Sequence, residues 1–212
     1  MTTIDFHGVR LGDDALTYAL GTYEPQEMSL ADQLFEAGDR VVVAGCGMGW
    51  LAALIARRVG PANVLGVEPL AHLVELVRQN VEVDGVPLAV RHGALTPGGT
   101  AVEVREDPEC WALTRTRPWN IVSEGVWAPG VDLRPLQAAG WDCLALDIEG
   151  GEVDVLTEEV LRRCRKLLVD LHRFAVDTTD LEKRIEGAGL RLVGEHDRMP
   201  TENATHQAWA RW

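Results

Sequence analysis

The sequence predicts an α/β fold in which helices cover both faces of a mostly parallel sheet of about seven strands. Apolar, strand-like runs alternate with helical patterns along most of the 212 residues. Hydrophobic residues make up 46% of the chain, which is enough for one sizeable core. A turn with three glycines follows the first strong apolar run, as at the strand-to-helix turns where folds of this class hold a ligand. We therefore expect a single domain over residues 1–212.

Five apolar runs are expected to form the parallel strands, and two further runs to close the sheet as an antiparallel pair. The parallel strands are predicted at residues 40–44, 63–68, 87–92, 142–148 and 167–171, and the closing pair at 190–195 and 206–211. Helices are predicted between them at residues 51–58, 70–82, 152–164 and 179–188. In each of these segments apolar residues recur at spacings of three and four, which is the period of an amphipathic helix.

Two regions break this alternation. The N-terminal segment 1–39 holds one short helical pattern, at residues 28–36. The insertion 96–141 is rich in proline, glycine and tryptophan, and its residues 102–105 and 120–124 are predicted to pair as a hairpin. Long irregular insertions near the carboxyl ends of strands often wall substrate pockets. Four tryptophans of the insertion are therefore expected either to form an aromatic wall or to pack in the core: Trp111, Trp119, Trp127 and Trp141.

The composition restricts the class of partner. A formal charge of −13 argues against nucleic acid, because proteins bind polyanions through basic surfaces. No apolar run reaches the roughly 18 to 20 residues of a membrane span, and the first residues lack the order of a secretory signal, so we expect a cytoplasmic protein with small molecules or proteins as substrates. The four cysteines show no metal-binding spacing and are expected to be reduced thiols.

The glycine turn indicates the kind of ligand. Gly45, Gly47 and Gly49 follow an apolar strand, and Glu68 ends the next strand. Glycine lets the main chain turn sharply and approach a ligand closely, while the following helix offers free N–H groups. A carboxylate at the tip of the second strand can accept both hydroxyls of a ribose. We infer an adenosine-containing cofactor.

The spacing of the glycines favours one class of cofactor over another. Dinucleotide sites need G-x-G-x-x-G, whose third glycine lets the helix pack close to the strand. Here Trp50 occupies the later position and would block that packing. The spacing G-x-G-x-G after an apolar strand resembles instead the first motif of class I S-adenosylmethionine methyltransferases. A nicotinamide-dependent oxidoreductase remains as a less favoured alternative.

A second group of polar residues follows the fourth and fifth predicted strands. The fourth strand ends at Asp147, with Glu149 and Glu152 close behind, and the fifth leads into His172. Because the fourth strand should lie beside the first, Asp147 is expected to approach the crevice at Gly45. Histidine can take a proton near neutral pH. Glu152 is also explained as a favourable charge at a helix N-terminus.

Together these segments resemble the FkbM family of S-adenosylmethionine-dependent methyltransferases from about residue 20 to residue 195. The resemblance is carried by residues 21–24, 38–45, 66–69, 147–152 and 170–172. It implies a Rossmann-like class I methyltransferase fold, S-adenosylmethionine as cofactor, S-adenosylhomocysteine as product, and methylation of a hydroxyl in natural product biosynthesis or on a sugar. It also implies a cofactor site on Tyr23, Glu24, Gly45, Cys46, Gly47, Gly49, Glu68, Pro69, Gly93, Ala94 and Asp147.

The chain departs from the family at two positions. Valine stands at position 43, where such proteins usually carry an aspartate near the methionine part of the cofactor. Either another acid such as Glu24 or Glu27 replaces that carboxylate, or affinity for the cofactor is weaker. Gly93 replaces an aspartate after the third strand, which leaves backbone N–H groups to read the adenine edge.

We expect an in-line attack of an acceptor oxygen on the sulfonium methyl, assisted by a general base. The base is either His172, oriented by Asp147, or Asp147 itself, with Glu149 beside them. A carboxyl acceptor would need no base. Asp147, Glu149 and His172 would also admit a divalent metal, although none is expected. A non-catalytic binding protein, an aminopropyl transfer and a homo-oligomer all stay open.

Overall fold

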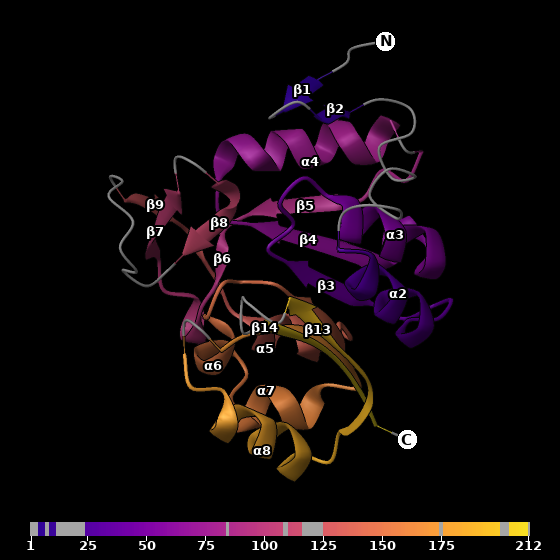
Figure 1. Cartoon of the computed structure of the whole chain (residues 1–212), viewed down its shortest axis with the longest axis vertical. Helices are drawn as coiled ribbons and strands as arrows, with labels where there is room; N and C mark the ends of the chain where they lie inside the picture. The colour runs from indigo at the N-terminus through magenta and orange to yellow at the C-terminus, as the bar shows by residue number, and fades with distance from the viewer. Residues whose placement is uncertain are drawn as a thin grey trace.

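A computed structural model describes residues 4–6, 9–11, 24–83, 85–107, 110–115, 125–173, 176–199 and 204–211. Helices lie on both faces of a central sheet (Figure 1). The sheet has seven strands in the order β13-β14-β12-β11-β3-β4-β5, which confirms the predicted α/β class. The strands are β3 (Val41–Ala44), β4 (Val64–Glu68), β5 (Ala89–His92), β11 (Cys143–Leu146), β12 (Lys166–His172), β13 (Arg191–Met199) and β14 (Ala204–Ala210).

The sheet is parallel except at one strand. β3 pairs in parallel with β4 and β11, as do β4 with β5 and β11 with β12. β14 runs antiparallel to both of its neighbours, β12 and β13, which confirms the predicted closing pair. The last strand in sequence is therefore an internal strand of the sheet.

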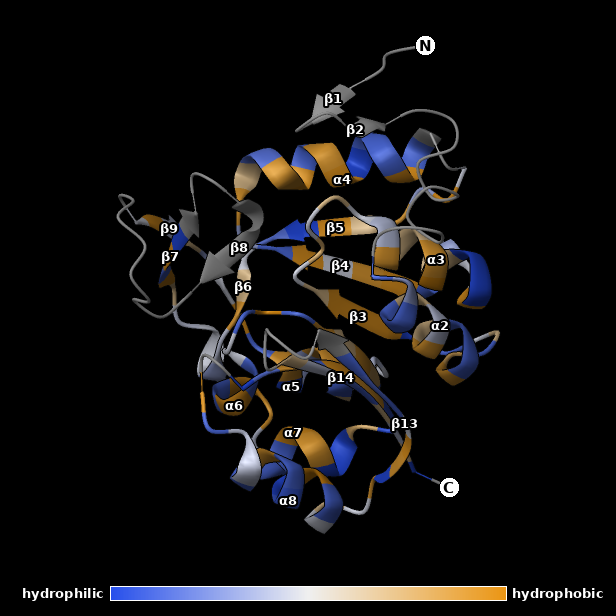
Figure 2. Cartoon of the chain, in the orientation of Figure 1, coloured by the Kyte–Doolittle hydropathy of each residue, from blue (hydrophilic) through white to orange (hydrophobic). Residues whose placement is uncertain are grey.

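Helices cover both faces of this sheet. Its central strands β3 and β4 are mostly apolar, whereas β5 and β13 at the two edges carry polar, exposed residues (Figure 2). Alternate residues of β3 show the division, because Val41 and Val43 pack in one core cluster and Val42 and Ala44 in the other. The first cluster includes α2 (Pro25–Leu34), α3 (Trp50–Val59) and α4 (Ala71–Val83). The second includes α5 (Leu133–Ala138), α6 (Glu152–Val155), α7 (Glu158–Arg163) and α8 (Thr179–Gly187). Full burial of each such aliphatic side chain contributes roughly 1.5–3 kcal/mol.

The single helix predicted over residues 152–164 is wrong. The chain forms α6 and then a separate α7, because Thr157 takes an extended conformation and its hydroxyl accepts a hydrogen bond from the Val160 amide at 3.4 Å. A side-chain oxygen at this position satisfies one of the free amides that begin a helix, and so it starts a new one. The helix predicted at 28–36 begins earlier, at Pro25, a residue whose fixed φ suits the first turn.

The insertion forms small sheets beside the main one. β7 (Val102–Asp107) pairs with both β8 (Cys110–Arg115) and β9 (Val126–Ala128). The predicted partner of β7, residues 120–124, lies outside the described residues. β6 (Ala94–Leu95) pairs in parallel with β10 (Gly130–Val131), and this contact ties the insertion to the end of β5.

The remaining elements are short. β1 (Ile4–Phe6) and β2 (Val9–Leu11) form an antiparallel pair, where the sequence predicted only a helical pattern in segment 1–39. Two 3-10 turns are η1 (Pro61–Asn63) and η2 (Pro97–Gly99). Among the described helices, none combines the length and the apolar character that crossing a membrane would require.

Candidate active site

A cavity lies where β3, β4, β5 and β11 end and α2 begins. Its lining includes Glu24, Glu27, Met28, Gly45, Cys46, Gly47, Trp50, Glu68, Pro69, Gly93, Ala94, Asp147 and Glu149. The carboxyl ends of parallel strands are the usual place for a ligand in such a sheet. The predicted crevice at the glycine turn is therefore present.

The turn after β3 needs glycine for two reasons. Gly45 and Gly47 have φ angles of 78° and 52°, in the left-handed region that favours glycine. In addition, a Cβ on Gly45 would overlap the carbonyl oxygen of Asp147. The bare main chain of the turn therefore lies directly against the end of β11. This contact places Asp147 beside Gly45, as predicted.

Glu68 closes the other side of the turn. Its side chain is buried, Oε2 accepts a hydrogen bond from the Gly47 amide at 3.1 Å, and Oε1 accepts one from the Leu70 amide at 3.0 Å. A carboxylate has about four acceptor positions, so these two bonds leave capacity for ribose hydroxyls. Burial and the nearby Glu68 raise the pKa of the Cys46 thiol, which is therefore protonated at neutral pH.

One residue predicted for the cofactor site, Gly49, does not line the cavity. A Cβ there would stand 3.0 Å from Val77 Cγ1, so Gly49 serves the packing of α3 against α4. Tyr23 lies outside the described residues.

The expected reading of adenine by free N–H groups after β5 is wrong. The Gly93 amide donates to the carbonyl oxygen of Glu68 at 2.9 Å, and the Ala94 amide donates to that of Pro129, also at 2.9 Å. Both donors are thus used to connect β4, β5 and the insertion. Gly93 and Ala94 line the cavity, but their N–H groups are already occupied.

The aromatic wall expected from the insertion is also not formed by the described tryptophans. Trp127 is 70% exposed, and Trp141 lies under the guanidinium of Arg40 at 4.3 Å from the ring centroid. Neither lines the cavity, and the side chains of Trp111 and Trp119 lie outside the described part. Trp50, which the sequence analysis used only as an argument against a dinucleotide site, does line the cavity.

The position of Val43 explains how the chain tolerates valine there. Its side chain is fully buried in the apolar cluster on the α2 side of the sheet and is absent from the cavity lining. Glu24 and Glu27, which we expected as alternative acids, both line the cavity. The carboxyl groups in this part of the cavity thus come from the start of α2 and not from β3.

His172 lies behind the cavity wall, at the centre of a group of acids. Its Nε2 is 3.4 Å from Asp147 Oδ1 and 3.4 Å from Glu149 Oε2, and its Nδ1 is 3.3 Å from Glu152 Oε1. Glu152 Oε1 also accepts a hydrogen bond from the Ile148 amide at 3.0 Å. Glu152 therefore connects the imidazole to the turn that carries Asp147 and Glu149.

These contacts set the protonation states. Burial disfavours a charged imidazole, but the contact with Glu152 and the charges of Asp147 and Asp170 outweigh it and raise the pKa of His172 to about 10. Burial also raises the pKa of Asp147 well above its ordinary value, and Asp170 and Glu149 add to this while His172 opposes it. At neutral pH, His172 is therefore a cation.

Sequence reasoning did not find two members of this acidic region. Asp170 is fully buried and lies 3.5 Å from His172 Nε2, and His206 on β14 lies opposite Asp170 in the strand register. Asp170 falls within a segment that carried the family resemblance, so a signal for it was present. For His206 there was none, because its place depends on β14 inserting between β12 and β13.

Comparisons with known proteins agree with this geometry. The family model "Protein-L-isoaspartate(D-aspartate) O-methyltransferase (PCMT)" matches residues 23–105. A ribosomal protein L11 methyltransferase of Thermotoga neapolitana is 32% identical over 82 residues, which are 38% of this chain and 31% of that protein. A D-guloside 3-dehydrogenase of Escherichia coli K12 is 36% identical over 87 residues, 38% of this chain and 21% of that protein. The chain spans less than a third of either relative.

Solved structures extend the likeness to most of the chain. The precorrin-6y C5,15-methyltransferase of Geobacter metallireducens has a TM-score of 0.53 at 12% identity, over 91% of this chain and 90% of that chain. A candidate tRNA (m1A22) methyltransferase of Streptococcus pneumoniae, solved with S-adenosyl-L-methionine, has a TM-score of 0.53 at 13% identity, over 88% and 72%. The fold is thus the Rossmann-like fold of class I methyltransferases. Both the ribosomal protein L11 methyltransferase and the structure solved with S-adenosyl-L-methionine are named as methyltransferases.

Proposed function

We propose that the protein is an S-adenosylmethionine-dependent methyltransferase of the FkbM type that methylates an oxygen of a small molecule, such as a natural product or a sugar. The observation that carries this proposal is the position of Asp147. Its carboxyl group lines the cavity beside the glycine turn, and its pKa is raised. A carboxylate of raised pKa next to a cofactor turn is suited to take a proton from an attacking hydroxyl.

The residues at the strand ends fit the cofactor. S-adenosylmethionine supplies, when bound, a methyl group on a positively charged sulfur. Glu68 would accept hydrogen bonds from the ribose hydroxyls, and the main chain at Gly45 and Gly47 would allow close approach of the ligand because these residues lack a Cβ. Glu24, which lines the same cavity, would offer an acceptor for the ammonium group.

His172 has a supporting role in this proposal. As a buried cation 3.4 Å from Asp147, it holds the carboxylate in place and favours its charged form before proton transfer. Glu152 fixes the imidazole from the other side. His172 is thus a positioning residue, and Asp147 is the base for a hydroxyl acceptor. A carboxyl acceptor would attack without a base, so the effect of removing Asp147 distinguishes the two acceptor classes.

The acidic charge of the chain supports a small-molecule acceptor over nucleic acid. The likeness to a candidate tRNA methyltransferase rests on 13% identity, which concerns the fold and not the acceptor. Cytoplasmic location remains part of the same proposal.

Isothermal titration with S-adenosylhomocysteine tests the cofactor assignment directly. We expect one site per chain, and the absence of heat and of thermal stabilisation at millimolar ligand would end the proposal. NAD serves as the contrasting ligand, because a dehydrogenase is among the matched relatives. Stabilisation by NAD and not by S-adenosylhomocysteine would favour an oxidoreductase. Release of S-adenosylhomocysteine across a panel of hydroxyl and carboxyl acceptors then separates an enzyme from a binding protein.

A further inference from the structure

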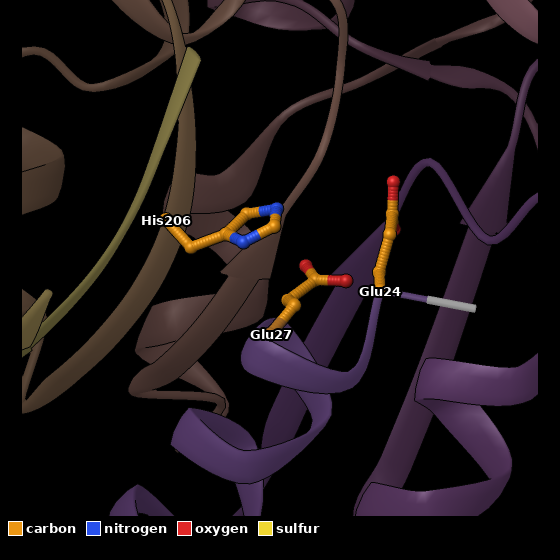
Figure 3. Close-up of side chains that lie close together, drawn as sticks. All are labelled: Glu24, Glu27 and His206. Carbon is orange, nitrogen blue, oxygen red and sulfur yellow. The ribbon is translucent and has the colours of Figure 1, made fainter. Parts of the chain in front are cut away.

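Three acidic or basic side chains meet on the α2 side of the sheet, next to the His172 group, to which Asp170 connects them. Glu24 stands immediately before α2, Glu27 lies in its first turn, and His206 projects from β14 toward them (Figure 3). One ligand atom from each lies within 4.8 Å of the others. Residues some 180 positions apart in sequence thus converge on one point.

Two of the three side chains are buried with unused polar atoms. His206 is 1% exposed, and its Nδ1 has no hydrogen-bond partner among the described residues. Its other nitrogen, Nε2, faces Asp170 Oδ2 at 3.4 Å. Glu27 is 3% exposed, and its Oε1 likewise has no hydrogen-bond partner within the part of the chain described. Buried polar atoms of this kind usually contact a partner, and their cost when unpaired is substantial.

The surroundings favour a positive ion at this point. Besides Glu24 and Glu27, two more acids lie at this point: Asp170 Oδ2 is 3.4 Å from His206 Nε2, and Asp147 lines the same cavity as Glu24 and Glu27. Four acids therefore act on one another across a buried region. A bound cation would be attracted to the carboxyl groups gathered here.

We propose that Glu24, Glu27 and His206 bind a divalent transition-metal ion such as Mn²⁺ or Zn²⁺. Carboxylate oxygens suit Mn²⁺, an imidazole nitrogen suits Zn²⁺ and other transition metals, and a mixed set of three protein ligands leaves coordination positions open. Asp170 beside the Nε2 atom of His206 orients the ring, as acids often do for metal-binding histidines.

The location gives the ion a second role, which rests on the proposed function. Glu24 and Glu27 line the cavity, so an open coordination position would face a ligand there. An acceptor with neighbouring oxygen atoms, such as a diol or a hydroxy acid, would suit that position. Metal binding itself does not depend on methyl transfer.

Titration of the chelator-treated full chain with Mn²⁺ and with Zn²⁺ tests the site. We expect one ion per chain in calorimetry and a bound-Mn²⁺ signal in electron paramagnetic resonance. Glu27→Gln and His206→Gln should each weaken binding at least tenfold. Asp32→Asn on the exposed side of α2 and His72→Gln on the exposed side of α4 remove the same chemical groups elsewhere and should bind as the unchanged protein does.

Unfolding temperatures measured in chelator show whether each variant still folds without metal. Glu27→Gln should unfold at the same or a higher temperature than the unchanged protein without metal, because it removes a buried acid, and metal should stabilise only the unchanged protein and the controls. The proposal is overturned if no ion binds at millimolar concentration, or if both site variants bind normally. Loss of binding in Asp170→Asn with normal binding in Glu27→Gln would place the ion on Asp147, Asp170 and His172 instead, and would also overturn it. Binding of S-adenosylhomocysteine is measured separately in chelator, so the metal site and the proposed methyltransferase function can each fail without the other.

Discussion

Nε2 of His172 lies 3.4 Å from Oδ1 of Asp147, with the imidazole fully buried and the carboxylate at the cavity wall. This pair joins the interior of the sheet to the site where a ligand would bind. The protonation of the imidazole and the position of the carboxylate therefore depend on each other. The first two predictions test the two members of the pair separately.

Replacing Asp147 with asparagine should reduce kcat at least about tenfold with a hydroxyl acceptor, because the base is lost while the shape is kept. Affinity for S-adenosylhomocysteine should stay within about threefold, which calorimetry measures. Asp180→Asn, which removes an exposed carboxylate on α8, is the matched control. Unchanged turnover in Asp147→Asn would rule out this residue as the base.

Replacing His172 with glutamine should change how stability depends on pH. The pKa of His172 is raised in the folded protein to about 10, above the value of about 6.5 for an unfolded chain. The charged imidazole therefore contributes its full stabilisation below about pH 6.5, and this is lost as the pH rises toward 10. In urea unfolding, the difference between the unchanged protein and His172→Gln should shrink over this interval. A difference that stays constant with pH would contradict the assigned charge.

Replacing Glu68 with glutamine should weaken S-adenosylhomocysteine binding about 10- to 100-fold. An amide has one acceptor oxygen, whereas Glu68 uses two oxygens to hold the Gly47 and Leu70 amides and would also accept the ribose hydroxyls. Calorimetry gives the change directly. Glu75→Gln, on the exposed side of α4, should bind the ligand normally, and equal affinities in the two variants would remove Glu68 from the site.

A comparison of Gly45→Ala with Gly38→Ala distinguishes the cost of a strained backbone conformation from the cost of a steric overlap. Both glycines have positive φ, 78° and 91°, so each alanine costs about 1 kcal/mol from conformation alone. A Cβ on Gly38 meets no atom within 4 Å, while one on Gly45 would overlap the Asp147 carbonyl. Gly45→Ala should therefore lower the free energy of unfolding by about 1–3 kcal/mol more than Gly38→Ala. Equal losses would show that the turn tolerates a side chain.

Asp39→Asn tests an ion-pair network at the opposite end of the sheet. Asp39 is buried and contacts Arg165 at 2.6 Å and Lys166 at 2.8 Å, and hydrogen bonds from these cations lower its pKa even though burial opposes them. Its stabilisation is present above about pH 3.9 and is lost as the pH falls through the lowered value. The variant should lose about 2 kcal/mol at pH 7 in urea unfolding, and this loss should diminish in acid. A variant as stable as the unchanged protein at pH 7 would contradict the role of the network.

The sequence was sufficient for most of the fold, and the reason is visible in the strands. β3 and β11 are buried on both faces, so every residue in them is apolar. Such a continuous run does not show the spacing of three and four that an amphipathic helix has. Gly45, Glu68 and Asp147 were found for a similar reason, since the ends of parallel strands meet at one edge. The boundary between α6 and α7 at Thr157 depends on one hydrogen bond to a hydroxyl. The spacing of apolar residues gives no sign of it.

The remainder of the site depends on contacts between distant segments. Backbone bonds of Gly93 and Ala94 to Glu68 and Pro129 are set by how the insertion folds back on β5. The partnership of Asp170 with His206 depends on strand order. The charge state of His172 follows from acids on two strands and a helix, whereas its sequence neighbours alone suggested a neutral base.

The internal position of β14 has a consequence for how the protein acquires its site during folding. Until β14 enters between β12 and β13, both of those strands have an unpaired edge, and an intermediate at this stage is prone to associate with other chains. The same step delivers His206 to Glu24 and Glu27. An ion added during refolding should therefore be captured only in the slowest phase, when the long-range strand pairing is complete.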